Sequence, residues 1–333
     1  MPSSKVETFT DLDAYHAAIR ETQPEGVVTA SGTFGAELTS IKFDRLSLYR
    51  SEESLPRVAY TALDPKLFVV VFSISPGPPG SVHGLGLSSG DIIVFRAGST
   101  GHNRTLAPCK WGGIALRHEA IAEAGRALTG RELIAPPLTQ VIKPPPHLLS
   151  RLLGLHEAAG HLAKASPDIL AQPEPGRAME LALAEAMVAC LESSDPVIER
   201  SAYRVHAKIM RRFEEALQAN LEGPLFITEL CSAVGVSHST LRICCRERLG
   251  MGPKRYLLLR RMHLAHRALL SAGPEQTTVT DTATNYGFWE LGRFAVTYHS
   301  LFGESPSATL RRPPENSKPG DKGESWSRFT KIA

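Results

Sequence analysis

Two adjacent cysteines, Cys244 and Cys245, lie inside the basic and periodic segment LCSAVGVSHSTLRICCRERLG at residues 230–250. Neighbouring thiols could serve as a redox switch or as two ligands of a metal ion. A zinc site needs further ligands at defined spacing, and none lie nearby in the sequence. Free cysteine usually behaves as a small hydrophobic residue, so we expect the pair to pack in a core. Control by cysteine oxidation stays open as an alternative.

The residues around this pair predict a helix-turn-helix. A first helix over 227–234 is expected to end at Gly235, which readily adopts a left-handed turn, and Ser237 is expected to cap a second helix over about 238–248. The inward positions of that second helix recur at three- and four-residue spacing; they are Leu241, Cys244, Cys245 and Leu249. The opposite face is polar, as in a helix that enters the major groove of DNA.

The arrangement occurs a second time in VTDTATNYGFWELGRFAVTYHSLFG. A helix over 279–286 is expected to end at Gly287, and a second helix follows over about 289–301. The intervening helix PKRYLLLRRMHLAHRALL has about 18 residues and a length of about 27 Å. One turn of duplex DNA is about 34 Å long. We therefore expect both recognition helices to enter successive major grooves.

The order of these motifs, with LGMGPKRYLLLRRMHLAHRALL, VTDTATNYGF, RF and FGESP in succession, resembles the C-terminal domain of AraC/XylS-type transcriptional regulators over about 205–311. The resemblance implies a sequence-specific DNA-binding regulator, an activator rather than an enzyme, with RNA polymerase as a partner and no cofactor. Three positions depart from the family pattern. Ile243 stands where arginine is frequent, Cys245 where phenylalanine is frequent, and Gly292 where serine is usual.

The resemblance and the exposed-face pattern together select the residues expected to contact double-stranded DNA. They are His238, Ser239, Arg242, Arg246, Lys254, Arg255, Glu290, Arg293 and Thr297. Arginine can bond guanine or phosphate, although a row of charges also suits a merely solvated helix face. We expect the first motif to read most of the base sequence and the second to contact mainly the phosphate backbone.

Three further residues each have two possible roles. Arg261 is expected either to contact phosphate, as Arg260 would, or to brace the fold through internal hydrogen bonds. Phe288 and Trp289 are expected to fill the core rather than to stack on bases.

The preceding part of the chain predicts a different kind of domain. Short runs rich in β-branched and aromatic residues, separated by turn residues, extend from 26 to 116, and helical periodicity begins at 147. The expected fold class is α+β and multidomain: an N-terminal β-barrel or cupin-like sandwich with helices, then an all-α tandem helix-turn-helix domain. The expected domains are a cupin-like effector-sensing domain at 1–145, a helical linker or dimerisation segment at 146–200, the DNA-binding domain at 203–312 and a disordered tail at 313–333.

Ligand and partner expectations for the N-terminal part come mostly from the resemblance. His83, His102 and His118 stand singly, without the close pairing of a metal cupin, so no metal site is expected. A small organic effector is expected inside the barrel by family likeness alone. The two helices at 147–193 could form a homodimer interface or simply pack against the barrel. A cupin enzyme fused to a regulator, and a regulator gated by a protein partner, remain alternatives.

Charge and hydropathy limit the kinds of partner and the cellular location that we expect. Residues 1–200 carry a net charge of −4 and residues 201–312 a net charge of +6, so only the second part is expected to meet a polyanion. The N-terminus has no charged start followed by an apolar run, and LFVVVFSI is far too short for a bilayer. The five cysteines form no C-x-x-C, which is typical of a reducing compartment. We expect a soluble cytoplasmic protein without membrane contact.

Overall fold

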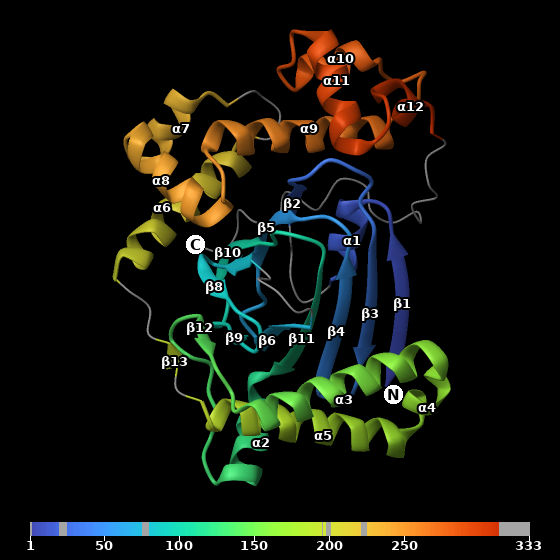
Figure 1. Cartoon of the computed structure of the whole chain (residues 1–333), viewed down its shortest axis with the longest axis vertical. Helices are drawn as coiled ribbons and strands as arrows, with labels where there is room; N and C mark the ends of the chain where they lie inside the picture. Colours follow the sequence, from blue (N-terminus) through green and yellow to red (C-terminus); the bar gives the residue numbers. More distant parts are fainter. Residues whose placement is uncertain are drawn as a thin grey trace. The chain divides into compact units, whose positions relative to one another are not determined.

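A computed structural model describes residues 2–19, 25–74, 80–194, 196–197, 201–220 and 225–312 (Figure 1). The expected tail at 313–333 lies outside these residues. The described chain forms two compact units, one containing residues 2–220 and 225–259 and the other beginning at residue 260. The first helix-turn-helix therefore belongs to the same compact unit as the N-terminal sheets, and the second belongs to the other unit.

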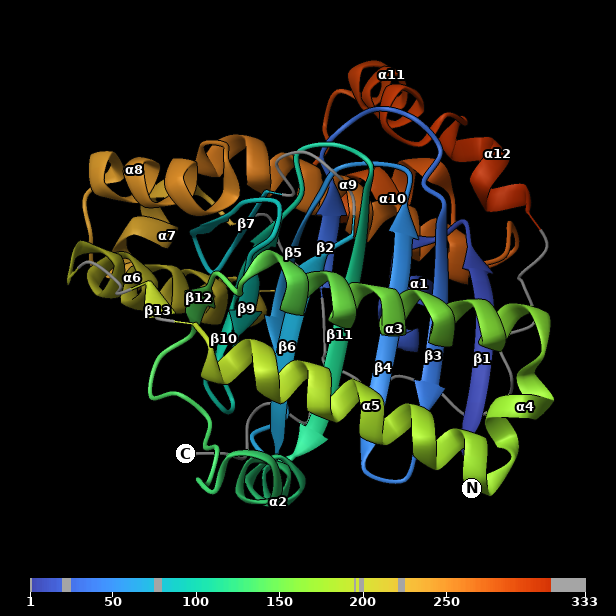
Figure 2. The same ribbon diagram turned by 60° about the horizontal axis from the view of Figure 1, so that its bottom comes forward.

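Two antiparallel sheets form the N-terminal part of the first unit (Figures 1 and 2). The larger sheet has the order β1-β3-β4-β11-β6-β9-β12-β13, with strands Ser3–Phe9, Ala36–Lys42, Leu46–Glu53, Cys109–Arg117, Leu67–Ser73, Ile92–Val94, Gln140–Ile142 and Pro196–Val197. The smaller sheet has the order β2-β5-β10-β7-β8, with strands Glu25–Val28, Arg57–Ala62, Thr100–Arg104, Gly80–Val82 and Leu85–Leu87. This part of the molecule, residues 2–142, is called the sheet domain below.

The central strands of the larger sheet are rich in β-branched and aromatic residues and are buried on both faces. In β3 and β4, which pair with Ile41 opposite Leu48, successive side chains point to opposite faces, so that Leu38 and Tyr49 enter one hydrophobic core and Ile41 and Leu48 enter another. Val70 and Ile114 continue this core on the neighbouring strands β6 and β11. The sheet-rich N-terminal part and the helical C-terminal part confirm the expected fold class.

Helices cover the outer face of the larger sheet (Figure 2). Helix α3 (Pro146–Ala165) and helix α5 (Pro173–Glu192) cross it, joined by the short helix α4 (Pro167–Ala171). Leu152, Leu183 and Met187 lie in the same hydrophobic cluster as the strands. The apolar stripes of the two long helices are therefore used inside the fold, as in the packing alternative. Helices α1 (Leu12–Ala18) and α2 (His118–Thr129), which the sequence pattern did not predict, complete the sheet domain.

Helices make up the rest of the described chain. The first unit continues with α6 (Ser201–Gln218), α7 (Ile227–Val234) and α8 (His238–Leu249). Helix α9 (Pro253–Ser271) begins in the first unit and ends in the second. The second unit contains α10 (Val279–Asn285), α11 (Leu291–Phe302) and α12 (Pro306–Arg311). Its core is aromatic, with Phe294 against Phe288 and Tyr298 at ring-centroid distances of 4.9 and 5.5 Å.

Candidate nucleic-acid interface

The first helix-turn-helix forms where the sequence predicts it. Helix α7 ends at Gly235, whose φ of 74° lies in the left-handed region, and the Gly235 amide donates to the Cys231 carbonyl at 2.9 Å. The Ser237 hydroxyl accepts from the Thr240 amide at 3.2 Å and so caps α8. The glycine turn and the serine cap together set the direction in which α8 leaves α7.

The outer face of α8 is polar and solvent-exposed. It presents His238, Ser239, Arg242, Ile243 and Arg246. Within the described residues, the guanidinium groups of Arg242 and Arg246 have no carboxylate within 4.0 Å. No internal ion pair therefore has to be broken before these groups bond a guanine edge or a phosphate. Lys254 and Arg255, in the first turn of α9, are also exposed.

The inner face of α8 is buried. Leu241, Cys244, Cys245 and Leu249 are all fully buried, so the packing expectation for the cysteine pair is confirmed. Burial raises the pKa of both thiols, and it raises the pKa of Cys109 to about 12 and that of Cys190 to about 11. A thiol with a raised pKa supplies little thiolate at neutral pH, which makes oxidation of these four residues slow.

One buried residue on α8 was not expected. Arg248 is only 3% exposed, and a Cβ placed on Gly84 of the sheet domain would lie 2.5 Å from its Nη1 atom. Arg248 follows Leu241 by seven residues, a helical repeat that could have placed it on the buried stripe from sequence alone. The arginine therefore packs against the backbone of the sheet domain instead of reaching outward.

A buried polar pair strengthens this packing. His102 on β10 is 2% exposed, and its Nε2 lies 2.6 Å from the Glu214 carboxylate on α6. The Tyr256 hydroxyl on α9 donates to the same carboxylate at 3.4 Å. The guanidinium of Arg104, also on β10, meets the backbone of Gly250 directly after α8. The sheet domain thus contacts α6 and α9 through a shared carboxylate and contacts the end of α8 through Arg104.

The second helix-turn-helix is also built from a capped first helix and a glycine turn. Thr278 caps α10 by accepting from the Asp281 amide at 3.1 Å, and Gly287 supplies the turn with a φ of 75°. Arg261 donates to the Gly287 carbonyl at 3.3 Å and lies over the Phe288 ring at 5.0 Å. These contacts favour the bracing alternative for Arg261, because both of them stabilise the turn.

Helix α11 begins at Leu291, two residues later than the sequence pattern predicts. Phe288 is buried as expected, but Trp289 is 77% exposed, so the expectation that it fills the core is wrong. The reason is its position: it precedes the helix, and the core beside it is already filled by Phe288 and Phe294. Periodicity cannot assign a face to a residue that lies outside the helix.

The exposed face of α11 is more apolar than that of α8. Leu291 and Val296 are 40% and 72% exposed, and Thr297 is half-buried. Arg293 is paired with Glu290, its Nη1 lying 3.2 Å from the carboxylate. The structure thus brings the expected residues of each motif together on one face of its second helix, and among those residues Arg293 is in an ion pair.

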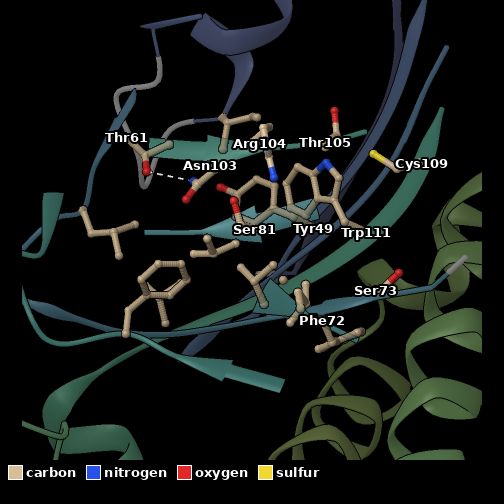
Figure 3. A pocket seen from close by; sticks show the side chains of 18 of the residues that line it. Tyr49, Thr61, Phe72, Ser73, Ser81, Asn103, Arg104, Thr105, Cys109 and Trp111 are labelled. Atoms are coloured by element: carbon tan, nitrogen blue, oxygen red, sulfur yellow. Dashed lines mark hydrogen bonds between the residues drawn. The ribbon is translucent and has the colours of Figure 1, made fainter. Parts of the chain in front are cut away.

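A cavity of about 130 Å³ lies between the two sheets (Figure 3). Its wall is mostly apolar, but Ser81 Oγ, Asn103 Oδ1 and Arg104 Nε at its edge are buried without a hydrogen-bond partner in the described chain. The Asn103 amide donates to Thr61 at 2.9 Å (Figure 3). On another wall, Trp111 and Arg57 bond the Glu53 carboxylate at 2.7 and 2.6 Å. The sequence pattern marked none of these residues.

The three singly spaced histidines have separate roles. His83 is buried and lines a second cavity, His102 pairs with Glu214, and His118 Nε2 lies 3.0 Å from the Pro65 carbonyl. The residues that the structure describes contain no group of three or more metal-ligating side chains. None of the described helices is both long and apolar enough to cross a membrane.

Comparison with known proteins places the similarity in the helical part. Residues 230–312 match a family model described as a helix-turn-helix domain. A probable thc operon regulatory protein of Rhodococcus erythropolis is 39% identical over 32% of this chain and 32% of its own length. XylDLEGF operon transcriptional activator 3 of Pseudomonas putida is 30% identical over 39% of this chain and 41% of its own length. The matching region thus spans between about a third and two fifths of the length of these two relatives.

Two solved structures are also similar. A probable AraC family transcriptional regulator from Rhodopseudomonas palustris is 37% identical, covering 31% of this chain and 94% of that one, with a TM-score of 0.28. The AraC-like transcriptional activator CuxR is 14% identical, covering 83% and 98%, with a TM-score of 0.38. Wherever the identity reaches 30%, the similar region covers only about a third of this chain. A double helix-turn-helix region has about that length.

Proposed function

We propose that the chain is an AraC-type transcriptional regulator that binds a specific promoter sequence and activates the adjacent operon, because residues 230–312 match a helix-turn-helix family model and the similar proteins are operon regulators. In this proposal residues 203–312 bind DNA and residues 1–145 sense a signal. The observation that carries it is the exposed face of α8, on which Arg242 and Arg246 have no carboxylate partner among the described residues and which a glycine turn and a serine cap position. Activation adds a contact with RNA polymerase, because the Pseudomonas putida relatives are operon activators.

The two motifs divide the readout. Arg242 and Arg246 are proposed to bond base edges or phosphates in one major groove, with His238 and Ser239 near the start of the helix. Lys254 and Arg255 contact phosphates beside them. On α11, the Glu290–Arg293 pair faces the backbone, while Leu291 and Val296 suit the methyl groups of thymine. The second motif then adds a preference for thymine rather than for guanine.

The cavity between the sheets is proposed to hold the effector. At about 130 Å³ it is close to the roughly 150 Å³ of an engineered apolar cavity that binds benzene, so a single-ring molecule is the appropriate size. The unpartnered Ser81, Asn103 and Arg104 atoms would bond a polar substituent on that ring. Arg104 also contacts Gly250 at the end of α8, so a ligand that engages it alters the support of the first motif.

The proposal is tested by fluorescence anisotropy with the full chain. A labelled duplex from the upstream region of its own gene is compared with a scrambled duplex of equal composition at about 50 and 200 mM salt. We expect a preference for the upstream duplex that persists at the higher salt concentration, because base contacts do not depend on counterion release. Equal binding to both duplexes, lost together as salt increases, would show phosphate attraction without sequence recognition and would contradict the proposal.

A second measurement tests the effector cavity. Benzyl alcohol, which has one ring and one hydroxyl, serves as the probe in saturation-transfer NMR. We expect transfer to the wild-type chain and its loss in Leu87→Trp, because Leu87 lines the cavity and the larger ring fills it. Leu128→Trp, at an exposed position on α2, is the matched control.

A further inference from the structure

A second cavity, of about 340 Å³, lies within the first unit between the sheet domain and helices α6 and α8. Its sheet-domain wall includes His83, Arg96, Ser99 and Thr139, and its helical wall includes Lys208, Arg211 and Arg248. We call it the cationic cavity, because four of its lining residues are lysine or arginine and none is aspartate or glutamate. A concave surface with one sign of charge concentrates ligands of the opposite charge.

The cationic cavity is lined in part by buried polar atoms that make no hydrogen bond within the described chain. His83 Nε2 and Ser99 Oγ have no hydrogen-bond partner in the described chain, although these residues are only 7% and 4% exposed. Buried polar atoms are rarely left without a partner in folded proteins. Beside them lies Arg248, which is 3% exposed. Two neutral polar groups and one cation therefore line the same cavity.

The protonation state of His83 suits an anion acceptor. Burial and the neighbouring Arg248 lower the pKa of His83 to about 3, so its ring is neutral at physiological pH. A neutral imidazole donates one hydrogen bond without repelling the adjacent guanidinium. The Ser99 hydroxyl donates as well. Arg96, Lys208 and Arg211 are exposed around the cavity and add charge without a large desolvation cost.

The anion that fits this cavity is not the DNA backbone. Arg248 follows Arg242 by six residues on α8, which places the two side chains about 120° apart around the helix. Arg242 is exposed and Arg248 is buried against the sheet domain. A duplex bound to the outer face of α8 therefore cannot reach the buried guanidinium, whereas a small anion can.

We propose that the cationic cavity binds a small oxyanion, the phosphate or carboxylate group of a metabolite, through Arg248, His83 and Ser99 with Lys208 and Arg211 at its rim. The ligand bonds residues of the sheet domain and of helices α6 and α8 at the same time. It therefore stabilises the packing of the first motif on the sheet domain. That this packing regulates transcription rests on the proposed function; the binding itself does not.

The test is a calorimetric titration of the full chain with inorganic phosphate and, separately, with succinate, each against chloride at matched ionic strength. We expect saturable binding of at least one probe. Binding of phosphate alone identifies a phosphate site, and binding of succinate alone identifies a carboxylate site. Saturable binding is also expected to raise the melting temperature of the first unit, since a ligand that binds the folded state stabilises it.

Variants locate the site. Lys208→Gln with Arg211→Gln changes two exposed residues and is expected to fold normally while weakening binding about five- to tenfold. Arg248→Gln is expected to weaken it more than about tenfold. The matched control is Arg126→Gln, an exposed arginine on α2. Absence of saturable binding, or equal binding by the Lys208/Arg211 variant and the control, overturns the proposal. DNA anisotropy in chloride buffer tests the proposed function independently of either result.

Discussion

The two helix-turn-helix motifs share a backbone plan but differ in what surrounds them. The first contacts the sheet domain through Arg248 against Gly84 and Arg104 against Gly250, and the helix α6 on which it packs is joined to the same domain by the His102–Glu214 pair. The second is held by its own aromatic core of Phe288, Phe294 and Tyr298 and by the Arg261 brace at its turn. The first motif is therefore open to influence from the sheet domain, and the second is built to be stable within its own unit.

Removing the aromatic core tests whether the second unit is stable independently of the first. Phe294→Ala is expected to destabilise the second unit by about 3–5 kcal/mol, because Phe294 is 2% exposed and its loss leaves a cavity. Hydrogen exchange should show lost protection in α10–α12 and unchanged protection in α8. Val296→Ala, two residues away and 72% exposed, is the control. Equal loss in both motifs would mean that their stabilities are coupled.

The reverse experiment removes the polar contact between the sheet domain and α6, the helix on which the first motif packs. Glu214→Ala leaves His102 Nε2 buried without its partner, at a cost of about 2–3 kcal/mol in the free energy of unfolding of the first unit. The neighbouring Glu215→Ala is the control, since its ion pair with Arg211 is exposed. Urea denaturation followed at α6 and α8 measures the difference. Indistinguishable midpoints for the two variants would contradict a structural role for the buried pair.

DNA binding should separate the motifs as well. Arg242→Ala is expected to lose about 1–3 kcal/mol of discrimination between the specific and scrambled duplexes. Arg293→Ala should lose less than about 1 kcal/mol, because Arg293 is already paired with Glu290. Anisotropy at fixed salt provides both values, with Arg126→Ala as the control. A larger loss for Arg293→Ala would transfer the main base readout to the second motif.

A smaller effect is expected from pH. Burial, together with a neighbouring arginine in each case, lowers the pKa of His83 and of His156 in the first unit to about 3. The unfolded chain then binds more protons than the folded one between about pH 3 and 6.5. Stability is complete above about pH 6.5 and decreases as pH falls, by about 1 kcal/mol per histidine between pH 6 and 5. Denaturation at pH 7, 6 and 5 measures this slope.

The variant His156→Gln tests the assignment. Its amide can still donate to the Tyr49 carbonyl, which His156 Nε2 reaches at 2.9 Å, but it does not titrate. The slope should therefore decrease by about half. An unchanged slope would assign the acid sensitivity to other groups.

Local features of both motifs were predictable from sequence because local chemistry determines them. Gly235, Ser237 and Gly287 act within one or two turns of their own helix, and the cysteine pair follows the helical period. The pairing of Glu214 with His102 and the packing of Arg248 against Gly84 were not predicted, because each joins residues more than a hundred positions apart in the sequence. The same holds for the cavity between the sheets, whose residues come from strands distant in sequence. Trp289 was misplaced because its helix begins two residues later than the periodicity indicates.

The close packing of Arg248 on Gly84 and of Arg104 on Gly250 limits how this chain can be joined to a related protein in a chimera. A Cβ placed on Gly84 would meet the Arg248 guanidinium, and one placed on Gly250 would meet Arg104. A chimera that joins this DNA-binding region to another sensing domain must therefore inherit glycine and arginine as matched couples across the junction. Exchange at the chain segment before α6 separates both couples, whereas exchange within α9, where the first unit ends, keeps them together. The modular boundary for engineering thus falls between the two motifs rather than ahead of them.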